Sequence, residues 1–553
     1  MRYAVGLDYG TLSARCLLIE LDTGKECVCV EYEYPHGVMD EKLPDGTPLQ
    51  REWALQYPMD YIQVLGAIKQ ALSEAGVDPR QIVSIGLVCT SCSPLPILND
   101  GTPLCCLEEF YSEPNAYVKL WKHHSAQPYA DRFTKTALER GEKFINLYGG
   151  KISSEWLFPK LFETLDLAPD VYHRMDHFVE AGDWIVYCLC GKLLRNNSAL
   201  GAKGMWSKEL GFPSKEYFEA VDPRLSAVVE DKISSQIAMV GTMAGRLCEK
   251  ASEWTGLPVG TPVAVAHLDG HGIPIGAGIS SPGKMLCILG TSACNLIMTE
   301  EYTDLPGICG GVSDIIVPGY IGIESGQSAF GDHFSWFVKN CVPSSYQQEA
   351  NERGVNIYKL LSDKAAAYAP GETGMIALDW WNGNRSILVD ASLSGMMLGF
   401  TLRTKPEDIF RTLLEATAFG MRVIMDNYEK YGIVVEKLVA AGGITGKNPL
   451  FMQMLADITG KQIELAYSRQ VPALSAAIWG TLAAGAENGG FNTLDEALSV
   501  MRPSEVHYYP DAEASKKYAK LYDEYVALHD YFGCGENDVM KRLKKLAAGK
   551  QEK

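Results

Sequence analysis

One aspartate, Asp269, has the placement expected of a catalytic general base. It follows the apolar run 263–268 and precedes Gly270-His271-Gly272. The carboxyl end of a strand faces the ligand crevice in α/β folds, so a carboxylate there can take a proton from a bound hydroxyl group. His267 and His271 could instead hold a metal ion with Asp269, but neither a cysteine pair nor an H-E-x-x-H helix accompanies them. The pattern therefore favours acid–base chemistry.

Two turns rich in small residues could bind phosphate groups. Each is expected between two strands, where small side chains let backbone N–H groups approach an anion closely. A glycine between strands is often only a turn, so either turn alone is weak support, whereas matching positions in two halves of the chain strengthen it. Two such hairpins could face one triphosphate. The nucleotide-binding candidates are Gly10, Thr11, Ser13 and Arg15 in the first turn, and Gly290, Thr291 and Ser292 in the second.

A third glycine-containing turn suits the base and ribose of a nucleotide. Gly442 and Gly443 follow the buried apolar run 438–441, and Asn448 precedes an expected helix at 449–459. The alternative interpretation is a strand-to-helix loop in which glycine only allows a sharp turn. The segment matches neither the dinucleotide pattern G-x-G-x-x-G nor the phosphate-loop pattern G-x-x-x-x-G-K-[ST], which disfavours a Rossmann or Walker-type site.

These candidate residues lie on elements whose pattern repeats along the chain. Short apolar runs separated by turns predict a three-stranded meander at the start, followed by a helix and a buried parallel strand. A similar meander begins after the break at 280–283, and a long helix and a buried strand follow it. The pattern predicts an α/β fold of two duplicated lobes, with the boundary after residue 281. The runs are 3–8, 14–21, 27–32, 58–76 and 83–88 in the first half, and 285–289, 295–298, 406–431 and 438–441 in the second.

Composition excludes several classes of protein. The 553 residues are 47% apolar and 21% charged, as in a globular protein with a sizeable core. The 50 Lys and Arg residues are outnumbered by 68 Asp and Glu residues, and the net charge of -18 repels nucleic acids and anionic membranes. A phosphate substrate would therefore need a local site made of backbone N–H groups, a few lysines or a bound cation.

Cysteine usage and the start of the chain predict a cytoplasmic location. The 15 cysteines are scattered through apolar stretches, which indicates reduced core thiols, and Cys89 and Cys92 are expected to be buried thiols rather than metal ligands. Asp8 comes too early for a signal peptide, and no run approaches the roughly 20 apolar residues of a membrane span. The sequence leaves open whether the chain is a monomer or a homodimer.

Taken together, the candidate residues resemble the FGGY family of carbohydrate kinases, and the resemblance spans nearly the whole chain. The matching motifs are Asp8-Tyr9-Gly10-Thr11, Asp269-Gly270-His271, Gly290-Thr291-Ser292, and Ala441-Gly442-Gly443 with Asn448 and Gln453. Four longer stretches are most similar to family members that phosphorylate L-ribulose, namely residues 119–124, 148–156, 322–329 and 379–385. Matches of this length seldom arise by chance.

The resemblance implies an actin-like ATPase (ribonuclease H-like) fold with two lobes around a central cleft. Residues 1–281 would bind mainly the sugar, and residues 282–553, which include a helical tail, would bind mainly ATP. The expected reaction transfers a phosphoryl group from ATP to L-ribulose in L-arabinose catabolism, with Mg2+ as cofactor. The alternatives are a kinase of the same family for another ketose or polyol, such as D-ribulose, ribitol or xylulose, and a non-catalytic sensor of sugar and nucleotide.

Site residues carry over from the family position by position. Asp269 matches the catalytic base and Asp8 the acid associated with magnesium, and both are expected near the metal ion. The chain departs from the family at Val88, where an Asp is expected, and at Ser91, where Ala or Gly is expected, which leaves the details of the sugar pocket open. The expected sugar contacts are Lys203, Glu324 and Ser91, and the same phosphate and adenosine turns supply the nucleotide site.

Overall fold

The computed structural model divides the chain into two compact units. It describes residues 1–233, 236–308, 310–466, 468, 470–500 and 506–548. The expected boundary after residue 281 lies one residue from the observed one, but two segments that the sequence places in the second lobe fold with the first unit. Unit 1 comprises Met1–Ser280, Val312–Gly322 and Ser468–Pro503, and unit 2 comprises Ser281–Gly311, Ile323–Tyr467 and Ser504–Lys553.

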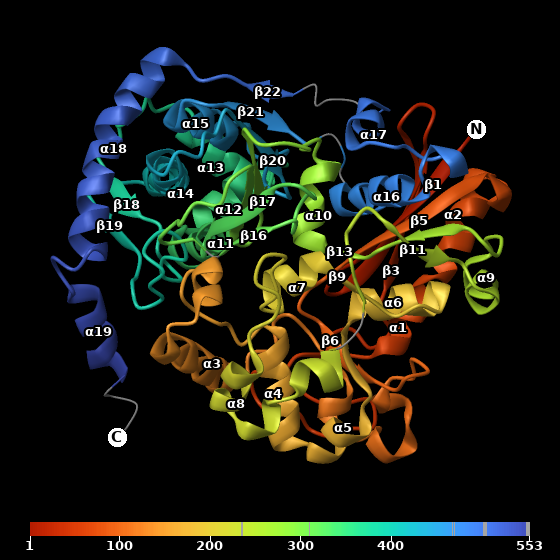
Figure 1. Ribbon diagram of the computed structural model, residues 1–553. Helices are drawn as coiled ribbons and strands as arrows, with labels where there is room; N and C mark the ends of the chain where they lie inside the picture. The colour runs from red at the N-terminus through yellow and green to blue at the C-terminus, as the bar shows by residue number, and fades with distance from the viewer. Residues whose placement is uncertain (234–235, 309, 467, 469, 501–505, 549–553) are drawn as a thin grey trace. The chain divides into compact units, whose positions relative to one another are not determined.

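The sheet of unit 1 begins with the predicted three-stranded meander. Strands β1 (Tyr3–Tyr9), β2 (Ser13–Glu20) and β3 (Lys25–Glu33) pair antiparallel in chain order, and β5 (Ile82–Cys89) pairs parallel with the other side of β1 (Figure 1). β12 (Pro262–Ala264) and β13 (His267–Leu268) both pair parallel with β5, and β11 (Met243–Arg246) is antiparallel to β12. The order is therefore β11-β12-β5-β1-β2-β3.

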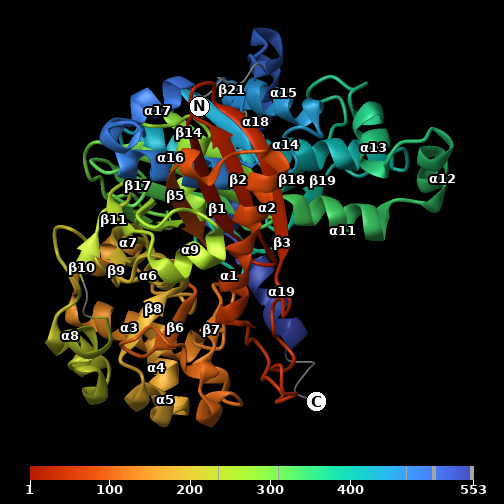
Figure 2. The same cartoon turned by 90° about the vertical axis from the view of Figure 1, so that its right-hand side faces the viewer.

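Helices cover both faces of this sheet. α2 (Gly66–Ala75) packs on β2 and β3, while α16 (Val471–Ala484) packs on the opposite face against β1 and β5 (Figure 2). Gly6 and Gly86 face α16, because a Cβ atom would lie 1.9 Å from the carbonyl oxygen of Ala473 at Gly6 and 1.8 Å from that of Ala476 at Gly86. This close backbone approach explains why Ser468–Pro503 folds with unit 1.

Two predicted elements of unit 1 are interrupted. The helix expected at 58–76 is divided at Leu65 into α1 (Pro58–Val64) and α2, since α2 starts at Gly66, a residue of low helix propensity. The strand expected at 263–268 is divided into β12 and β13. Its register against β5 shifts by one residue between them, since Val263 is aligned with Ile85 but His267 with Val88.

Short two-stranded sheets and helices make up the rest of unit 1. The pairs are β4 (Leu55–Gln56) with β7 (Val118–Lys119), β6 (Pro94–Ile97) with β8 (His177–Glu180), and β9 (Leu194–Asn196) with β10 (Gln236–Ala238). The helices are α3 (Gln127–Arg140), α4 (Leu157–Leu167), α5 (Pro169–Arg174), α6 (Ala181–Cys190), α7 (Asn197–Lys203), α8 (Lys215–Val221), α9 (Glu249–Thr255), α10 (Asp269–Gly276) and α17 (Leu494–Val500).

Unit 2 repeats the strand arrangement of unit 1, as the sequence predicts. β14 (Lys284–Leu289) and β15 (Ala293–Thr299) form an antiparallel hairpin, and β20 (Lys437–Ala441) pairs parallel with β14 as β5 does with β1. β17 (Ile321–Gln327) follows β15 in the sheet and β21 (Gln462–Leu465) follows β20, so β17-β15-β14-β20-β21 corresponds to β3-β2-β1-β5-β12. The outer strands are β16 (Gly310–Ser313) and β22 (His507–Tyr508).

The helices of unit 2 include the long helix predicted at 406–431. This helix, α14 (Pro406–Lys430), packs against α13 (Ile357–Ala365) and α15 (Pro449–Thr459), and α18 (Ala512–Gly533) packs on α15. The tail ends in α19 (Val539–Ala548), where Lys544 Nζ donates to the carbonyl groups of Ala391 at 3.0 Å and Leu393 at 2.8 Å, so the tail packs on its own unit. The other elements are α11 (Gly331–Cys341), α12 (Ser344–Glu352), β18 (Ile376–Leu378) and β19 (Met396–Leu398).

The cysteines are reduced, as predicted, but they are not all in the core. Every cysteine that the structure describes is a free thiol, and Cys89 and Cys92 are buried. Cys29, Cys106, Cys341 and Cys534 are exposed, so the prediction that the thiols belong to the core is wrong for these four. In the part of the chain that the structure describes, the helices are too short or too polar to span a lipid bilayer.

Candidate active site

Asp8 and Asp269 lie at the same edge of the unit 1 sheet. β1 and β13 both pair with β5, and both Asp8 and His267 are aligned with Val88. Asp269 comes two residues after His267 and is the first residue of α10. The Gly270 N–H donates to Asp269 Oδ1 at 2.6 Å, which orients the carboxylate. The two acids therefore flank the carboxyl end of β5, where α/β folds place their ligands.

The environment of Asp8 is short of positive charge. Burial, followed by the nearby Asp269 carboxylate, raises the pKa of Asp8 from 3.8 to about 7. The guanidinium group of Arg15 lies 3.6 Å from Asp8 Oδ2 and acts to lower this pKa, but it does not outweigh the other two effects. Two neighbouring carboxylates at one sheet edge form a fitting set of oxygen donors for a divalent cation.

The turn after β1 is held by side chains from distant parts of unit 1. Trp121 Nε1 donates to Thr11 Oγ1 at 3.0 Å, and Gln56 Nε2 donates to the Thr11 carbonyl oxygen at 2.8 Å. The Tyr34 hydroxyl donates to the carbonyl oxygen of Gly10 at 3.1 Å. These hydrogen bonds, which are accepted by oxygen atoms of Gly10 and Thr11, therefore hold the expected phosphate turn in place.

Ser13 and Arg15 line a hollow of ≈ 620 Å³ beside this turn. Ser13 Oγ donates to Glu31 Oε1 at 2.9 Å, and Arg15 Nη2 donates to the same oxygen at 2.8 Å. Glu33 lines the hollow as well. Ser13 and Arg15 are thus close to the expected phosphate turn, but a phosphate group would have to compete with Glu31 for their side chains.

Lys203, an expected sugar contact, ends α7 and forms an ion pair with Glu155. Its Nζ lies 3.1 Å from Glu155 Oε2. Burial acts to raise the pKa of Glu155, but Lys203, Lys160 and His124 outweigh burial, and the pKa is lowered. Glu155 is therefore ionised and orients the ammonium group of Lys203.

Ser91 follows β5 at the edge where Asp8 and Asp269 lie. The N–H of its neighbour Thr90 bonds to the carbonyl oxygen of Tyr9 at 3.1 Å, which ties this segment to β1. Ser91 is 8% exposed, and its hydroxyl oxygen has no hydrogen-bond partner among the described residues. Leaving a buried hydroxyl unpaired costs about 1–3 kcal/mol, so such a group is suited to complete its bonding with a ligand.

The turn from Gly290 to Ser292 occupies the corresponding place in unit 2. The Gly290 N–H donates to the Ser292 carbonyl oxygen at 3.1 Å. α11 begins against the turn, because the N–H groups of Phe330 and Gly331 donate to the carbonyl oxygens of Thr291 at 3.0 Å and Gly290 at 2.9 Å. A Cβ atom at Gly331 would lie 2.6 Å from the Gly290 oxygen, so this approach requires glycine. The N-terminus of a helix carries partial positive charge, so its position beside the turn favours the binding of an anion.

Gly442 brings the third turn next to the second. β20 is paired parallel with β14 up to Ala441, and a Cβ atom at Gly442 would lie 2.5 Å from the carbonyl oxygen of Leu289. Gly442 also has a φ of 105°, a conformation that favours glycine. At Gly443 an added Cβ atom would meet nothing within 4 Å, so this position faces open space.

Asn448 serves first as a helix cap. Its side chain accepts a hydrogen bond from the Phe451 N–H at 3.1 Å and so caps α15. The cap uses one acceptor position of the carboxamide oxygen, and the NH₂ group remains for the adenosine contact expected from the sequence.

Glu324 lies on β17 and forms an ion pair with Arg385. Three further buried groups of unit 2 form hydrogen bonds with one another, since Gln327 Nε2 donates to Asp379 Oδ2 at 2.8 Å and the Tyr525 hydroxyl donates to Asp379 Oδ1 at 2.8 Å. Tyr525 belongs to α18, so the tail helix supports the segment that carries Arg385.

Within each unit the structure gathers most of the candidates that the sequence indicates. Unit 1 brings Asp8, Asp269, Ser91 and the 10–13 turn to one edge of its sheet, and unit 2 places the 290–292 and 442–443 turns side by side. Sequence reasoning did not assign roles to the side chains that hold these groups, although most of them lie in the stretches that carry the family resemblance. These side chains are Trp121, Gln56, Tyr34, Glu155 and Arg385.

Proteins named ribulokinase are similar to this chain over almost its full length. That of Halalkalibacterium halodurans is 48% identical over 548 residues, which are 99% of this chain and 97% of that protein. That of Bacillus licheniformis is 49% identical over 538 residues, 97% of each chain, and that of Mycolicibacterium smegmatis is 44% identical over 548 residues, 98% of this chain and 96% of that protein.

Family and structural comparisons agree with this result. Residues 285–484 match the C-terminal domain of the FGGY family of carbohydrate kinases. The ligand-bound xylulose kinase of Lactobacillus acidophilus has a TM-score of 0.78 at 17% identity, covering 97% of this chain and 99% of that chain. The ADP-bound glycerol kinase of Plasmodium falciparum has a TM-score of 0.75 at 17% identity, covering 95% and 98%. The structures confirm the predicted α/β fold with two actin-like ATPase lobes, and the sequence relatives show that this chain belongs to the FGGY family of carbohydrate kinases.

Proposed function

We propose that this protein phosphorylates L-ribulose with ATP, giving L-ribulose 5-phosphate, as a step of L-arabinose catabolism. The observation that carries the proposal is the pair Asp8 and Asp269 beside the 10–13 turn at one sheet edge. Membership of a carbohydrate kinase family supports the class of reaction, and relatives named ribulokinase at 46–49% identity support the choice of sugar. Free cysteines fit a reaction in the cytoplasm, where ATP is available.

Asp269 acts as the general base in this reaction. Its carboxylate accepts the proton of the terminal sugar hydroxyl while that oxygen bonds to the γ-phosphorus and the bond from phosphorus to the ADP oxygen breaks. The Gly270 N–H binds Oδ1 and orients the carboxylate that takes the proton. A general base contributes roughly 10²–10⁴-fold, or about 3–5 kcal/mol, whereas alignment of the two reactants contributes roughly 7–11 kcal/mol. Positioning of the substrates therefore matters more than proton transfer alone.

Asp8 and Asp269 would hold Mg2+, which when bound supplies positive charge beside the phosphate groups. Oxygen donors of this kind are the ligands that Mg2+ prefers. Burial and then the Asp269 carboxylate raise the pKa of Asp8, and a divalent cation would lower it by stabilising the ionised form.

The remaining candidates divide between the two substrates. Ser91 and Lys203 in unit 1 offer hydrogen-bond donors to sugar hydroxyl groups, and Glu324 in unit 2, oriented by Arg385, offers an acceptor. We assign the phosphate groups of ATP to the 10–13 and 290–292 turns, because small residues let backbone N–H groups approach an anion closely. The adenosine belongs beside Gly442, Gly443 and Asn448, where open space is available.

An ADP-release assay over a panel of sugars tests the proposal. L-Ribulose should show the highest kcat/KM, with identification of the 5-phosphate by phosphorus NMR. D-Ribulose, ribitol and xylulose test the second candidate, a kinase for another ketose or polyol, because the unpaired hydroxyl of Ser91 adds a contact that could favour a different stereochemistry. Binding of sugar and nucleotide without ADP release would contradict the enzyme and indicate a sensor.

A further inference from the structure

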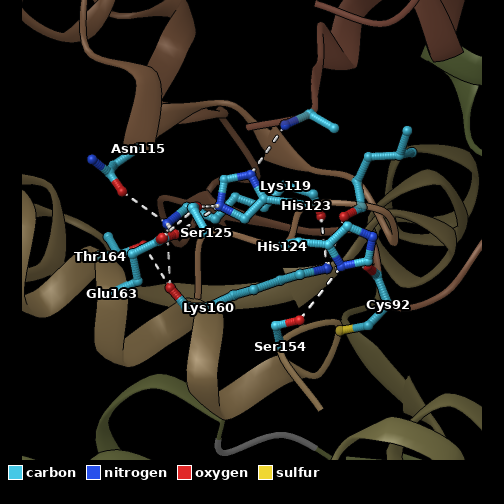
Figure 3. A network of polar contacts seen from close by, with 12 residues as sticks. Cys92, Asn115, Lys119, His123, His124, Ser125, Ser154, Lys160, Glu163 and Thr164 are labelled. Atoms are coloured by element: carbon cyan, nitrogen blue, oxygen red, sulfur yellow. Dashed lines mark hydrogen bonds and ion pairs between the residues drawn. The ribbon is translucent and has the colours of Figure 1, made fainter. Parts of the chain in front are cut away.

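Helix α4 places a buried lysine between two loops of unit 1. Lys160 is fully buried, and its Nζ donates to the carbonyl oxygens of Cys92 at 2.7 Å, Leu120 at 2.9 Å and Lys119 at 3.3 Å (Figure 3). An ammonium group has three N–H donors, so these acceptors use all of them. Lys160 therefore joins segments that are distant in the sequence and has no donor left for a substrate.

Both segments lead directly to the candidate site. Cys92 follows Ser91, whose hydroxyl is the unpaired group at the sheet edge. Leu120 precedes Trp121, which donates to Thr11 Oγ1 at 3.0 Å in the expected phosphate turn. One ammonium group is thus linked to the sugar side and to the phosphate side of the site.

The two segments differ in how much they depend on Lys160. The carbonyl oxygen of Leu120 also accepts the His123 N–H at 2.9 Å, so this segment keeps an anchor without the lysine. For the Cys92 carbonyl oxygen, Lys160 is the sole donor among the described residues. The loss of the ammonium group should therefore displace the segment at Ser91 more than the segment at Trp121.

The segment at Cys92 has a second anchor on its other side. Cys92 Sγ donates to Glu180 Oε1 at 2.8 Å, and the Ser93 N–H donates to Glu180 Oε2 at 3.0 Å. Glu180 and Lys160 together hold residues 92 and 93, so the orientation of Ser91 is set from both sides.

The charge of Lys160 has no close ionic partner. Burial lowers its pKa to about 8, and no carboxylate in the described part of the chain forms an ion pair with it. Glu163, one turn along α4, is instead bound to Lys119 at 2.6 Å and to His123 at 2.7 Å (Figure 3). Glu180 and Glu155 act on Lys160 only from a distance, and its hydrogen bonds all go to loop carbonyl groups, which indicates a role in loop geometry.

We propose that Lys160 is a positioning residue for sugar binding, which acts by holding the Cys92 carbonyl group and so aims the Ser91 hydroxyl at the sugar. This inference rests on the proposed function, since it takes the occupant of the site to be a ketose. It goes further by naming a side chain that does not touch the substrate and the residue through which it works.

A double-mutant cycle tests this coupling. The variants are Lys160→Met, Ser91→Ala and the combination, and the dissociation constant of L-ribulose is measured by calorimetry without nucleotide, so that the result does not depend on turnover. Each single change should weaken binding about tenfold, because each removes the hydrogen bond of the same hydroxyl. Added to Ser91→Ala, Lys160→Met should weaken binding by less than about threefold.

Two further variants keep the test decisive. Thr164→Val removes a bond from Thr164 Oγ1 to the Lys160 carbonyl oxygen, at 3.0 Å on the same buried helix, and should leave L-ribulose binding within about twofold. Should Lys160→Met not fold, Lys160→Gln replaces it in the cycle, and its neutral amide should give an intermediate loss of about threefold.

The outcomes separate this inference from the proposed function. Independent losses, which multiply to about 100-fold in the double variant, would overturn the inference, as would unchanged binding in the Lys160 variants. Sugar binding with the expected coupling but without ADP release from the wild-type protein would uphold the inference and refute the kinase.

Discussion

Replacing Asp269 by asparagine tests the general base with little disturbance of the site. The amide has the shape of the carboxylate, and its oxygen can keep the bond to the Gly270 N–H, which is 2.6 Å from Oδ1. That bond places the NH₂ group at the position of Oδ2, and the carboxylate that would take the proton from the sugar is lost. An amide nitrogen cannot accept this proton, so the variant should bind both substrates and transfer the phosphoryl group slowly.

The expected loss is roughly 10²–10⁴-fold in kcat, equivalent to about 3–5 kcal/mol of barrier. The KM for L-ribulose should change by no more than about threefold, because one hydrogen-bonding group replaces another of the same size. The pKa of Asp8 is a second quantity to measure, since the Asp269 charge helps to raise it. In the variant that pKa should fall, while burial keeps it above its usual range.

The assay is coupled ADP release, with calorimetry to confirm that sugar and nucleotide still bind. Asp22→Asn is the matched control, because Asp22 is an exposed carboxylate paired with Arg2 beyond the opposite end of β1 and β2. The control should retain wild-type turnover. A kcat within about tenfold of wild type for Asp269→Asn, with normal binding, would refute the assignment of the base.

Three other predictions concern stability and the phosphate turn. Burial raises the pKa of Asp183 from 3.8 to about 7, so the folded protein binds more protons than the unfolded chain between these values, and stability falls as pH rises from about 4 to 7. Asp183→Asn should remove up to about 4 kcal/mol of this fall in the free energy of unfolding, measured by urea unfolding at several pH values. An unchanged dependence of that free energy on pH would contradict the raised pKa of Asp183. Trp121→Phe removes the donor to Thr11 Oγ1 and should lower kcat/KM for ATP about five- to twentyfold in steady-state kinetics, whereas unaltered ATP kinetics would exclude a role for this turn. Gly86→Ala puts a Cβ atom 1.8 Å from a carbonyl oxygen of α16 and should destabilise the protein by about 3 kcal/mol or more in thermal unfolding, whereas Gly66→Ala, with open space, should not.

Much of the architecture follows from local patterns in the chain. Apolar runs separated by turn residues predict the meander at 3–32 and its counterpart after residue 284, and both are present. The long helix at 406–430 and the strand at 437–441 are found close to their expected ends. Such predictions succeed because strand and helix periodicity depend on neighbouring residues.

The division between the units could not be predicted in the same way. Ser468–Pro503 follows unit 2 in the chain but folds with unit 1, because α16 fits against the glycine-lined face of β1 and β5. Gly6 and Gly86 are ordinary strand residues in the sequence, and the need for glycine at both depends on α16, which begins only at residue 471. A single boundary along the chain cannot describe units that are each made of several separate segments.

The sequence by itself determined the class of fold, the family and the residue types that could do chemistry, since short motifs and their order along the chain carry that information. Only the tertiary structure decided which partners hold those residues in place. Trp121 is 110 residues from Thr11, and Lys160 is 68 residues from Cys92. Contacts of this range arise when packed elements bring buried donors and acceptors together, and each must find a partner once water is excluded.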